Sequence, residues 1–139
     1  MDRSEIEKIL PHRAPMLLID EAEIGEDGSA IGHYTVRGDE YFLQGHFPGN
    51  PVVPGVILCE MMAQTCAVLL AGSGAGKTPF FTSLDGVRFK NVVRPGDTIE
   101  FRCRLTGRRD PFHFAEGRGT VGGRLSVQGK FSFALLGGE

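Results

Sequence analysis

The chain has 139 residues, 41% of them hydrophobic and 23% charged, with a formal net charge of −2 at pH 7. These values describe one ordinary globular domain, residues 1–139, with room for a core but hardly for a second site. The charged N-terminus and the apolar run 56–71, which Glu60 and Gln64 interrupt, exclude a signal peptide and a membrane span. We therefore expect a cytoplasmic protein that does not bind membranes.

The N-terminal part of the chain predicts short elements. Residues 4–10 suit a short helix that Ser4 caps and Pro11 ends. The apolar run 16–19 fits a buried strand, and residues 30–37 fit a further strand.

The middle of the chain holds a rigid loop followed by a long helix. Residues 44–55, QGHFPGNPVVPG, contain three prolines and three glycines and so form no regular element. The fifteen residues 56–70 lack glycine and proline, exceed the length of an ordinary strand, and predict a helix. Because this helix is apolar on nearly all sides, we expect it to be buried.

The second half of the chain predicts strands. Residues 98–106 and 124–135 alternate apolar and polar side chains, which is the pattern of a strand with one buried face. Residues 80–89 and 112–121 are weaker candidates. One long helix followed by an antiparallel meander gives an α+β fold in which the sheet curls around the helix.

Glu60 is the first candidate for chemistry, because it is the only charged residue between Glu40 and Lys77. A lone carboxylate on a buried helix is costly unless it is paired or neutral, so its presence suggests a function. His46 lies in the rigid loop that leads into this helix, and Gly55 offers free backbone N–H groups at the helix start. A base, an acid and an oxyanion donor in one segment suit removal of a proton next to a carbonyl group. The plainer alternatives are a solvent-exposed Glu60 and a structural His46.

A competing pattern, residues 71–78, resembles a relaxed phosphate-binding loop, AxxxxGKT. A genuine loop of this kind begins with glycine and lies between a strand and a helix. Here the preceding segment predicts a helix, and Pro79 with the two phenylalanines that follow is a poor helix start. We therefore interpret 72–76 as a helix end and loop, and do not expect nucleotide binding.

The charges divide unevenly along the chain. Residues 1–76 carry four basic and eleven acidic side chains, a net of −7, whereas residues 77–139 carry eleven basic and six acidic ones, a net of +5. The basic half is either a set of solvated strand faces or a patch for an acidic partner, and no motif predicts nucleic-acid binding. Cys59, Cys66 and Cys103 form no metal-ligand pattern and predict reduced core thiols, so we expect no metal.

Three segments carry a resemblance to a known family: HRAPMLLID at 12–20, QGHFPGNPVVPGVILCEMMAQ at 44–64 and VRFKNVVRPGD at 87–97. They resemble the FabZ-type 3-hydroxyacyl-acyl carrier protein dehydratases, and the match runs over about residues 9–135. The resemblance implies a hot-dog fold, in which a curled antiparallel sheet wraps a long central helix. It also implies a homodimer, or a trimer of dimers, whose active sites combine the histidine of one chain with the acid of the other.

The resemblance also assigns roles to single residues. It makes His46 and Glu60 the catalytic pair, Gly55 the amide that polarises the thioester carbonyl, and Gln64 the residue that orients the Glu60 carboxyl group. Glutamate rather than aspartate at position 60 implies dehydration without isomerisation. The apolar side chains expected to line an acyl tunnel are Phe42, Phe47, Val53, Ile57, Met61, Phe80 and Phe81. Docking of the carrier protein is expected at Arg88, Lys90 and Arg94.

The implied reaction converts a (3R)-hydroxyacyl chain on the phosphopantetheine of acyl carrier protein to a trans-2-enoyl thioester, in fatty acid biosynthesis and without a cofactor. His46 removes the alpha proton and Glu60 assists departure of the 3-hydroxyl group. Two alternatives stay open: an acyl-thioester hydrolase on the same fold, which would not need His46, and a non-catalytic acyl-binding protein. Residues 72–81 and the tail after Thr106 depart from the family pattern.

Overall fold

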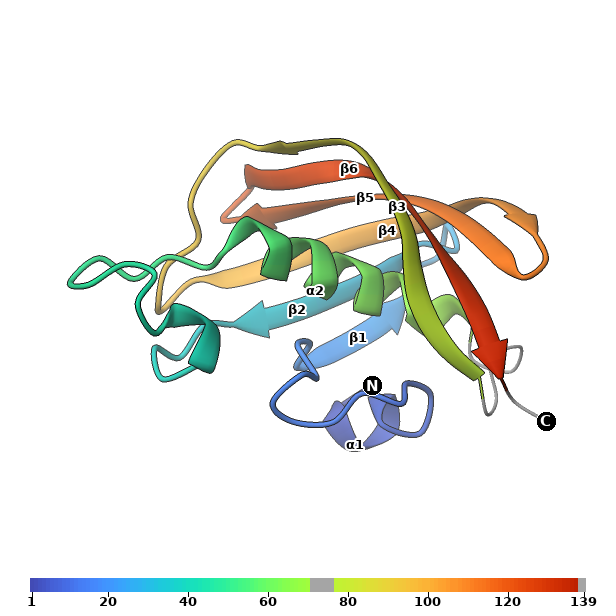
Figure 1. The fold of residues 1–139 in the computed structure, drawn as a ribbon, viewed down its shortest axis with the longest axis horizontal. Helices are drawn as coiled ribbons and strands as arrows, with labels where there is room; N and C mark the ends of the chain where they lie inside the picture. The colour runs from blue at the N-terminus through green and yellow to red at the C-terminus, as the bar shows by residue number, and fades with distance from the viewer. Residues whose placement is uncertain (71–76, 138–139) are drawn as a thin grey trace.

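A computed structural model describes residues 1–70 and 77–137, in which one sheet curls around one long helix (Figure 1). The antiparallel strands are β1 (Glu21–Ile24), β2 (Ala30–Thr35), β3 (Lys77–Phe89), β4 (Thr98–Arg109), β5 (Phe112–Val121) and β6 (Arg124–Gly137). The helical segments are α1 (Arg3–Ile6), η1 (Tyr41–Leu43), α2 (Gly55–Ala67) and η2 (Val68–Leu70). The predicted α+β hot-dog architecture is confirmed.

The long helix lies where the sequence predicts it: α2 and the η2 turn that follows it together cover residues 55–70. It lies close against the sheet at two glycines that have no side chain to hold it away. A Cβ on Gly32 of β2 would lie 2.5 Å from the Thr65 hydroxyl oxygen, and one on Gly117 of β5 would lie 2.9 Å from the Met62 side chain. Any larger residue at either position would push α2 off the sheet.

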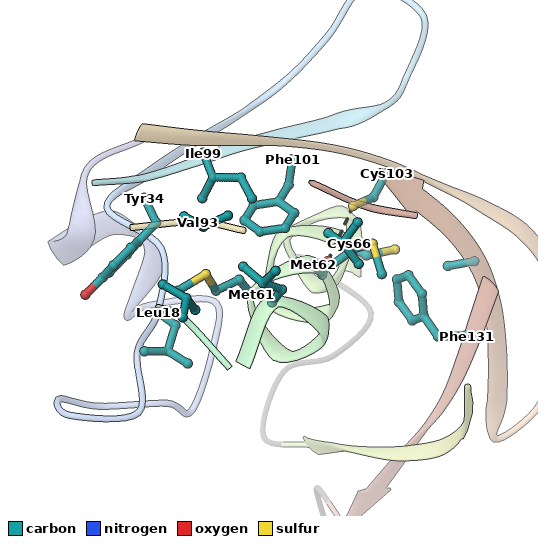
Figure 2. Close-up of a cluster of buried hydrophobic side chains, with 14 of the residues drawn as sticks. Leu18, Tyr34, Met61, Met62, Cys66, Val93, Ile99, Phe101, Cys103 and Phe131 are labelled. Carbon is teal, nitrogen blue, oxygen red and sulfur yellow. Dashed lines mark hydrogen bonds between the residues drawn. The ribbon is translucent and has the colours of Figure 1, made fainter. Parts of the chain in front are cut away.

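The core fills the space between α2 and the concave face of the sheet (Figure 2). Met61 and Met62 are fully buried and point to different parts of this core, Met61 toward Tyr34 and Met62 toward Cys103. The prediction of core thiols is confirmed, because all three cysteines are free and buried. Burial raises the pKa of the Cys66 thiol to about 12. Thiols in this state are unreactive and serve as small apolar side chains.

The order of the strands, β1-β2-β4-β5-β6-β3, corrects the predicted meander. Strands β4, β5 and β6 do follow one another as neighbouring strands. In contrast, β3 pairs with β6 rather than β4 and forms one edge of the sheet. The alternating patterns of 98–106 and 124–135 could not reveal this, because alternation predicts which face of a strand is buried and not which strand lies beside it.

Two N-terminal predictions are wrong. Residues 17–19 are buried but form no strand, and the backbone N–H of Leu18 donates instead to the Gln64 side chain at 2.8 Å. The first strand is β1, whose charged residues hid it from a search for apolar runs. Helix α1 is capped by Asp2 rather than Ser4, because Asp2 Oδ1 accepts from the Glu5 N–H at 2.9 Å.

The structure does not support a phosphate-binding loop. Lys77 begins strand β3, whereas such a loop requires a helix at this point. Positions 71–76 of the candidate motif lie outside the described residues. In the described ranges, no helix is long and apolar enough to cross a membrane.

A buried carboxylate holds the chain where β2 leads toward the rigid loop. Glu40 is 6% exposed and accepts hydrogen bonds from the Tyr34 hydroxyl at 2.8 Å and from the N–H groups of Arg37 and Gly38 at 2.9 and 2.8 Å. Burial alone would raise the pKa of Glu40, but these hydrogen bonds outweigh it and keep that pKa below its ordinary value. The Glu40 carbonyl accepts from the Leu43 N–H, so this network fixes the start of η1 and of the loop that follows.

We expect Glu40→Gln to lower the free energy of unfolding at neutral pH by about 1–3 kcal/mol, because an amide cannot accept from all three donors. The carboxylate stabilises the fold above the ordinary glutamate pKa of 4.5, and this contribution is lost as pH falls through the lower pKa of the folded state. The difference between wild type and variant should therefore shrink below pH 4.5. Urea titrations across this range measure it, with Glu23→Gln on exposed β1 as the control. A difference that does not change with pH would contradict this account.

Candidate active site

Glu60 is partly exposed on α2, one turn after the exposed Val56. Its side chain is 23% exposed, and its Oε2 has two neighbours. Gln64 Nε2 donates to this oxygen at 2.8 Å, and His12 Nε2 lies 3.5 Å from it. Within the described chain no hydrogen bond reaches Oε1. Glu60 is therefore held through one oxygen and can offer the other to a ligand.

Gln64 makes the contacts that hold Glu60 in place. It is 1% exposed, and both the oxygen and the nitrogen of its side-chain amide form hydrogen bonds. The Oε1 atom accepts from the Leu18 N–H at 2.8 Å, while Nε2 donates to the Met16 carbonyl and to Glu60, each at 2.8 Å. Because the same amide binds the N-terminal segment and the carboxylate, it fixes the position of Glu60 relative to residues 16–18. The contact expected from the sequence is present, and its catalytic importance stays a prediction.

His12 is a site residue that the sequence analysis quoted within a family-like segment but gave no role. Its side chain is 19% exposed, and its Nε2 faces Glu60. The other ring nitrogen, Nδ1, is buried and has no hydrogen-bond partner among the described residues. A ring with one nitrogen next to a carboxylate and one buried and unpaired is a candidate for exchange of a proton with Glu60. Its signal in the sequence was the position of a histidine just before the buried run 17–19.

The loop around His46 has a fixed shape, and its hydrogen bonds also determine which nitrogen of the imidazole ring carries the hydrogen. His46 Nδ1 donates to the Val52 carbonyl at 2.9 Å, and the His46 carbonyl accepts from the Val52 N–H at 2.9 Å. Since a carbonyl can only accept, Nδ1 carries the hydrogen, and Nε2 of the neutral ring has a free electron pair. Gly45 and Gly49 adopt φ of +81° and +70°, which the turns of this loop require. His46 is thus prepared to act as a base through Nε2.

Gly55 begins α2, and no described acceptor pairs with its backbone N–H. Free N–H groups at a helix start stabilise a developing negative charge. The ring of Phe89 covers this position so closely that a Cβ on Gly55 would lie 2.9 Å from it. Residue 55 must therefore be glycine if Phe89 is to stay where it is.

Within one chain, His46 and Glu60 do not form a pair. Among the described residues, the polar side-chain partners of Glu60 are His12 and Gln64, whereas the His46 ring contacts Val52 and Phe47. The two candidates therefore belong to separate clusters, one beside the N-terminal segment and one in the loop that extends beyond the start of α2 (Figure 1). A single site that uses both needs a second chain or a substrate that spans them.

A small cavity of about 40 Å³ lies beside Glu60. Three polar residues, His12, Glu60 and Gln64, line one part of this cavity. The rest of the lining is apolar and consists of Ala63, Ala67, Pro79, Phe81 and Phe133. This volume holds a water molecule or a little more, which is far less than an acyl chain needs. Within the described residues of one chain, this cavity is therefore too small for the acyl chain that the sequence analysis expects.

The predicted tunnel residues divide into three groups. Phe81 lines the cavity beside Glu60. Phe42, Val53 and Met61 are buried in the core, and Ile57 packs against it. Phe47 and Phe80 are both 52% exposed. Phe133 is a lining residue that the sequence analysis missed, because its alternation in β6 indicated only an inward-facing side chain.

The predicted docking residues Arg88, Lys90 and Arg94 are all exposed. A larger cavity of about 760 Å³ lies elsewhere, over side chains that alternate with the buried ones of β4 and therefore face away from α2. Its charged lining is mixed, and Arg104 already pairs with Glu116 there. The small cavity is the better candidate for chemistry, because its otherwise apolar lining contains Glu60, whose Oε1 has no hydrogen-bond partner among the described residues. In the part of the chain that the structure describes, no three potential metal ligands converge.

A family model for FabA-like domains matches residues 10–130. The chain is 46% identical over 135 residues to a 3-hydroxyacyl-acyl-carrier-protein dehydratase FabZ of Thermomicrobium roseum, covering 95% of this chain and 91% of that protein. It is 44% identical over 137 residues to the protein of the same name from Caldicellulosiruptor saccharolyticus, covering 96% and 98%.

Solved structures share the fold at lower identity. The dehydratase heterocomplex ApeI:P of Xenorhabdus doucetiae has a chain that superposes with a TM-score of 0.82 at 23% identity, covering 95% of this chain and 91% of that one. A hypothetical thioesterase of Streptococcus pneumoniae, solved with coenzyme A, superposes with a TM-score of 0.64 at 14% identity, covering 84% and 85%. At these identities, the superpositions support the fold alone.

We expect Gln64→Met, which keeps the size of the side chain, to lower the free energy of unfolding by about 2–4 kcal/mol, because the Leu18 N–H and the Met16 carbonyl lose their partner. Chemical denaturation measures this change. Gln128→Met on the exposed face of β6 is the matched control and should change stability by less than about 0.5 kcal/mol. Equal stability of the two variants would mean that the Gln64 amide does not hold the segment.

Proposed function

The chain belongs to the family of FabA-like domains, and from this premise we propose that it dehydrates 3-hydroxyacyl-acyl carrier protein in fatty acid biosynthesis. It is an enzyme, a hydro-lyase whose product is the trans-2-enoyl thioester, and we place it in the cytoplasm. The observation that carries the proposal is Glu60, a carboxylate held by Gln64 and His12 at the wall of an apolar cavity in a chain this similar to named dehydratases.

We propose that His46 and Glu60 share the proton transfers. Nε2 of His46 takes the alpha proton of the thioester, and the N–H of Gly55 stabilises the negative charge that develops on the carbonyl oxygen. The electrons of the broken C–H bond form the new double bond as the 3-hydroxyl group leaves. Glu60 supplies the proton for that hydroxyl through Oε1, so that water departs. His12 lies against the other oxygen, where it can return a proton to the carboxylate.

We propose a homodimer that pairs two copies of β3, because this strand presents an edge with no partner in the described chain. An exposed edge strand with apolar side chains normally pairs with another strand. Phe80, Phe81, Leu84 and Phe89 of β3 are between 40% and 53% exposed, and nearby Val56 at the start of α2 is 73% exposed. Such a dimer brings the His46 loop of one chain to the Glu60 cavity of the other. A trimer of these dimers is compatible with the same interface.

The acyl carrier protein is the proposed partner. Arg88 and Lys90 are exposed near the end of β3, close in sequence to Phe89, which covers Gly55. Cations at this place suit an acidic carrier, because they can direct its phosphopantetheine toward the helix start. The remaining predicted contact, Arg94, hydrogen-bonds within the chain to Asn50.

We expect the purified protein to form the enoyl thioester from a short 3-hydroxyacyl carrier-protein thioester, followed by enoyl absorbance. His46→Ala and Glu60→Gln should each lower kcat by at least about 100-fold, because each removes a proton-transfer group. Release of free thiol in place of enoyl product would instead identify a hydrolase. An inert wild type, or full activity in both variants, would refute the proposal.

The shared site can be tested by mixing the two inactive variants. When His46→Ala and Glu60→Gln chains are unfolded and refolded together, half of the dimers are mixed, and each mixed dimer regains one intact site. Activity should therefore return to about one quarter of wild type, as two-fold symmetry requires. Refolding each variant alone is the control and should restore nothing. If the mixture stays inactive although mixed dimers are detected by mass, the site lies within one chain.

A further inference from the structure

Arg94 uses its side chain inside the molecule. It lies in a turn closed by two hydrogen bonds with Asp97, whose Oδ2 accepts from the Arg94 N–H at 2.9 Å and whose N–H donates to the Arg94 carbonyl at 3.0 Å. From this fixed base, Nη1 of Arg94 donates to Oδ1 of Asn50 at 2.5 Å. A hydrogen bond with a charged donor of this kind is stronger than one between neutral groups. Its acceptor, Asn50, belongs to the loop that carries His46.

A continuous series of contacts connects Asn50 to the imidazole ring of His46. Asn50 and Phe47 exchange two backbone hydrogen bonds, at 2.9 and 2.8 Å, which close the turn at the tip of the loop. The ring of Phe47 stacks on the ring of His46, with 4.0 Å between centroids and 27° between planes. Movement of Asn50 would therefore move Phe47, and Phe47 is the surface against which the His46 ring rests.

The loop has few other attachments on this side. Among the described residues, hydrogen bonds join residues 46–53 to the segment 91–97 at two places. One is the Val53 N–H to the Val93 carbonyl at 2.8 Å, at the base of the loop. The other is Arg94 to Asn50, at its tip. Because the tip is exposed and packs against little else, the guanidinium is its lateral support.

We propose that Arg94 is a positioning residue that holds the His46 loop through Asn50. This inference rests on the proposed function, in which His46 is the base. It assigns Arg94 to the geometry of the site rather than to recognition of the carrier protein, which leaves Arg88 and Lys90 for that task. A base that must meet the alpha carbon within a fraction of an ångström loses rate when its support is loosened.

The test uses a substrate without a carrier protein, a short 3-hydroxyacyl thioester of pantetheine. Arg94→Gln and Asn50→Ala should each lower kcat on this substrate by about 3- to 10-fold, which corresponds to the loss of one hydrogen bond, with little change in KM. The double variant should be no slower than either single one, because both remove the same contact. Asn50→Asp should retain most activity, since a carboxylate accepts the same bond.

The matched control is Arg124→Gln. Arg124 also donates to an asparagine side chain, with 2.8 Å between its Nη2 and Oδ1 of Asn91, but that pair does not touch the loop. Its kcat should equal wild type, and its melting temperature should change as little as that of Arg94→Gln. Full activity of Arg94→Gln on the pantetheine thioester, with a loss only on the carrier-borne substrate, would overturn the inference and make Arg94 a docking residue.

A second readout separates this inference from the proposed function. The His46 ring resonances in NMR spectra should shift in Arg94→Gln and Asn50→Ala but not in Arg124→Gln. If wild type is inert on both thioesters, the proposed function fails while the resonances still decide whether Arg94 positions His46. Unchanged His46 resonances in both loop variants would overturn the positioning role.

Discussion

A carboxylate on a helix that otherwise carries no charge needs polar partners, and Glu60 finds a hydrogen-bond donor in Gln64 and a close neighbour in His12. Much of the N-terminal half follows from this constraint. The Gln64 amide is buried, so its oxygen and its second N–H also need hydrogen-bond partners. The backbone at residues 16–18 provides both of them. The N-terminal segment packs with the end of α2 and the start of η2 in a second small core, which includes Ile6, Leu17 and Val68. The acid and the N-terminal segment therefore hold each other in place.

The elements that could be predicted are those whose structure depends on neighbours in sequence. Helix α2, the loop before it and strands β4 and β6 follow from periodicity and from proline and glycine content. Apart from the cap of α1, where Asp2 takes the place expected for Ser4, the failures involve distant partners. Residues 16–19 looked like a strand because they are apolar, yet their backbone partner is a side chain on α2. Likewise, nothing local in β3 indicates that its neighbour is β6.

The same distinction applies to the site. The lack of other charges marked Glu60, and the proline-rich loop marked His46, because both signals are local. The environment of each residue was not local. His12 reaches Glu60 from far along the chain, and Arg94, which the resemblance assigned to carrier-protein docking, hydrogen-bonds to Asn50. Residue type therefore identified the reacting groups, while only the fold shows which side chains support them.

The place of β3 in the sheet has a consequence for how the protein is made. During synthesis β3 emerges before β6, its neighbour in the described sheet, and the β4-β5 hairpin has to be completed in between. In that interval both edges of β3, with Phe80, Phe81 and Leu84, have no strand beside them. Pairing with β6 protects one edge, and in the proposed dimer a second chain protects the other. A nascent chain is therefore most exposed to premature association at this strand until its own sheet has closed.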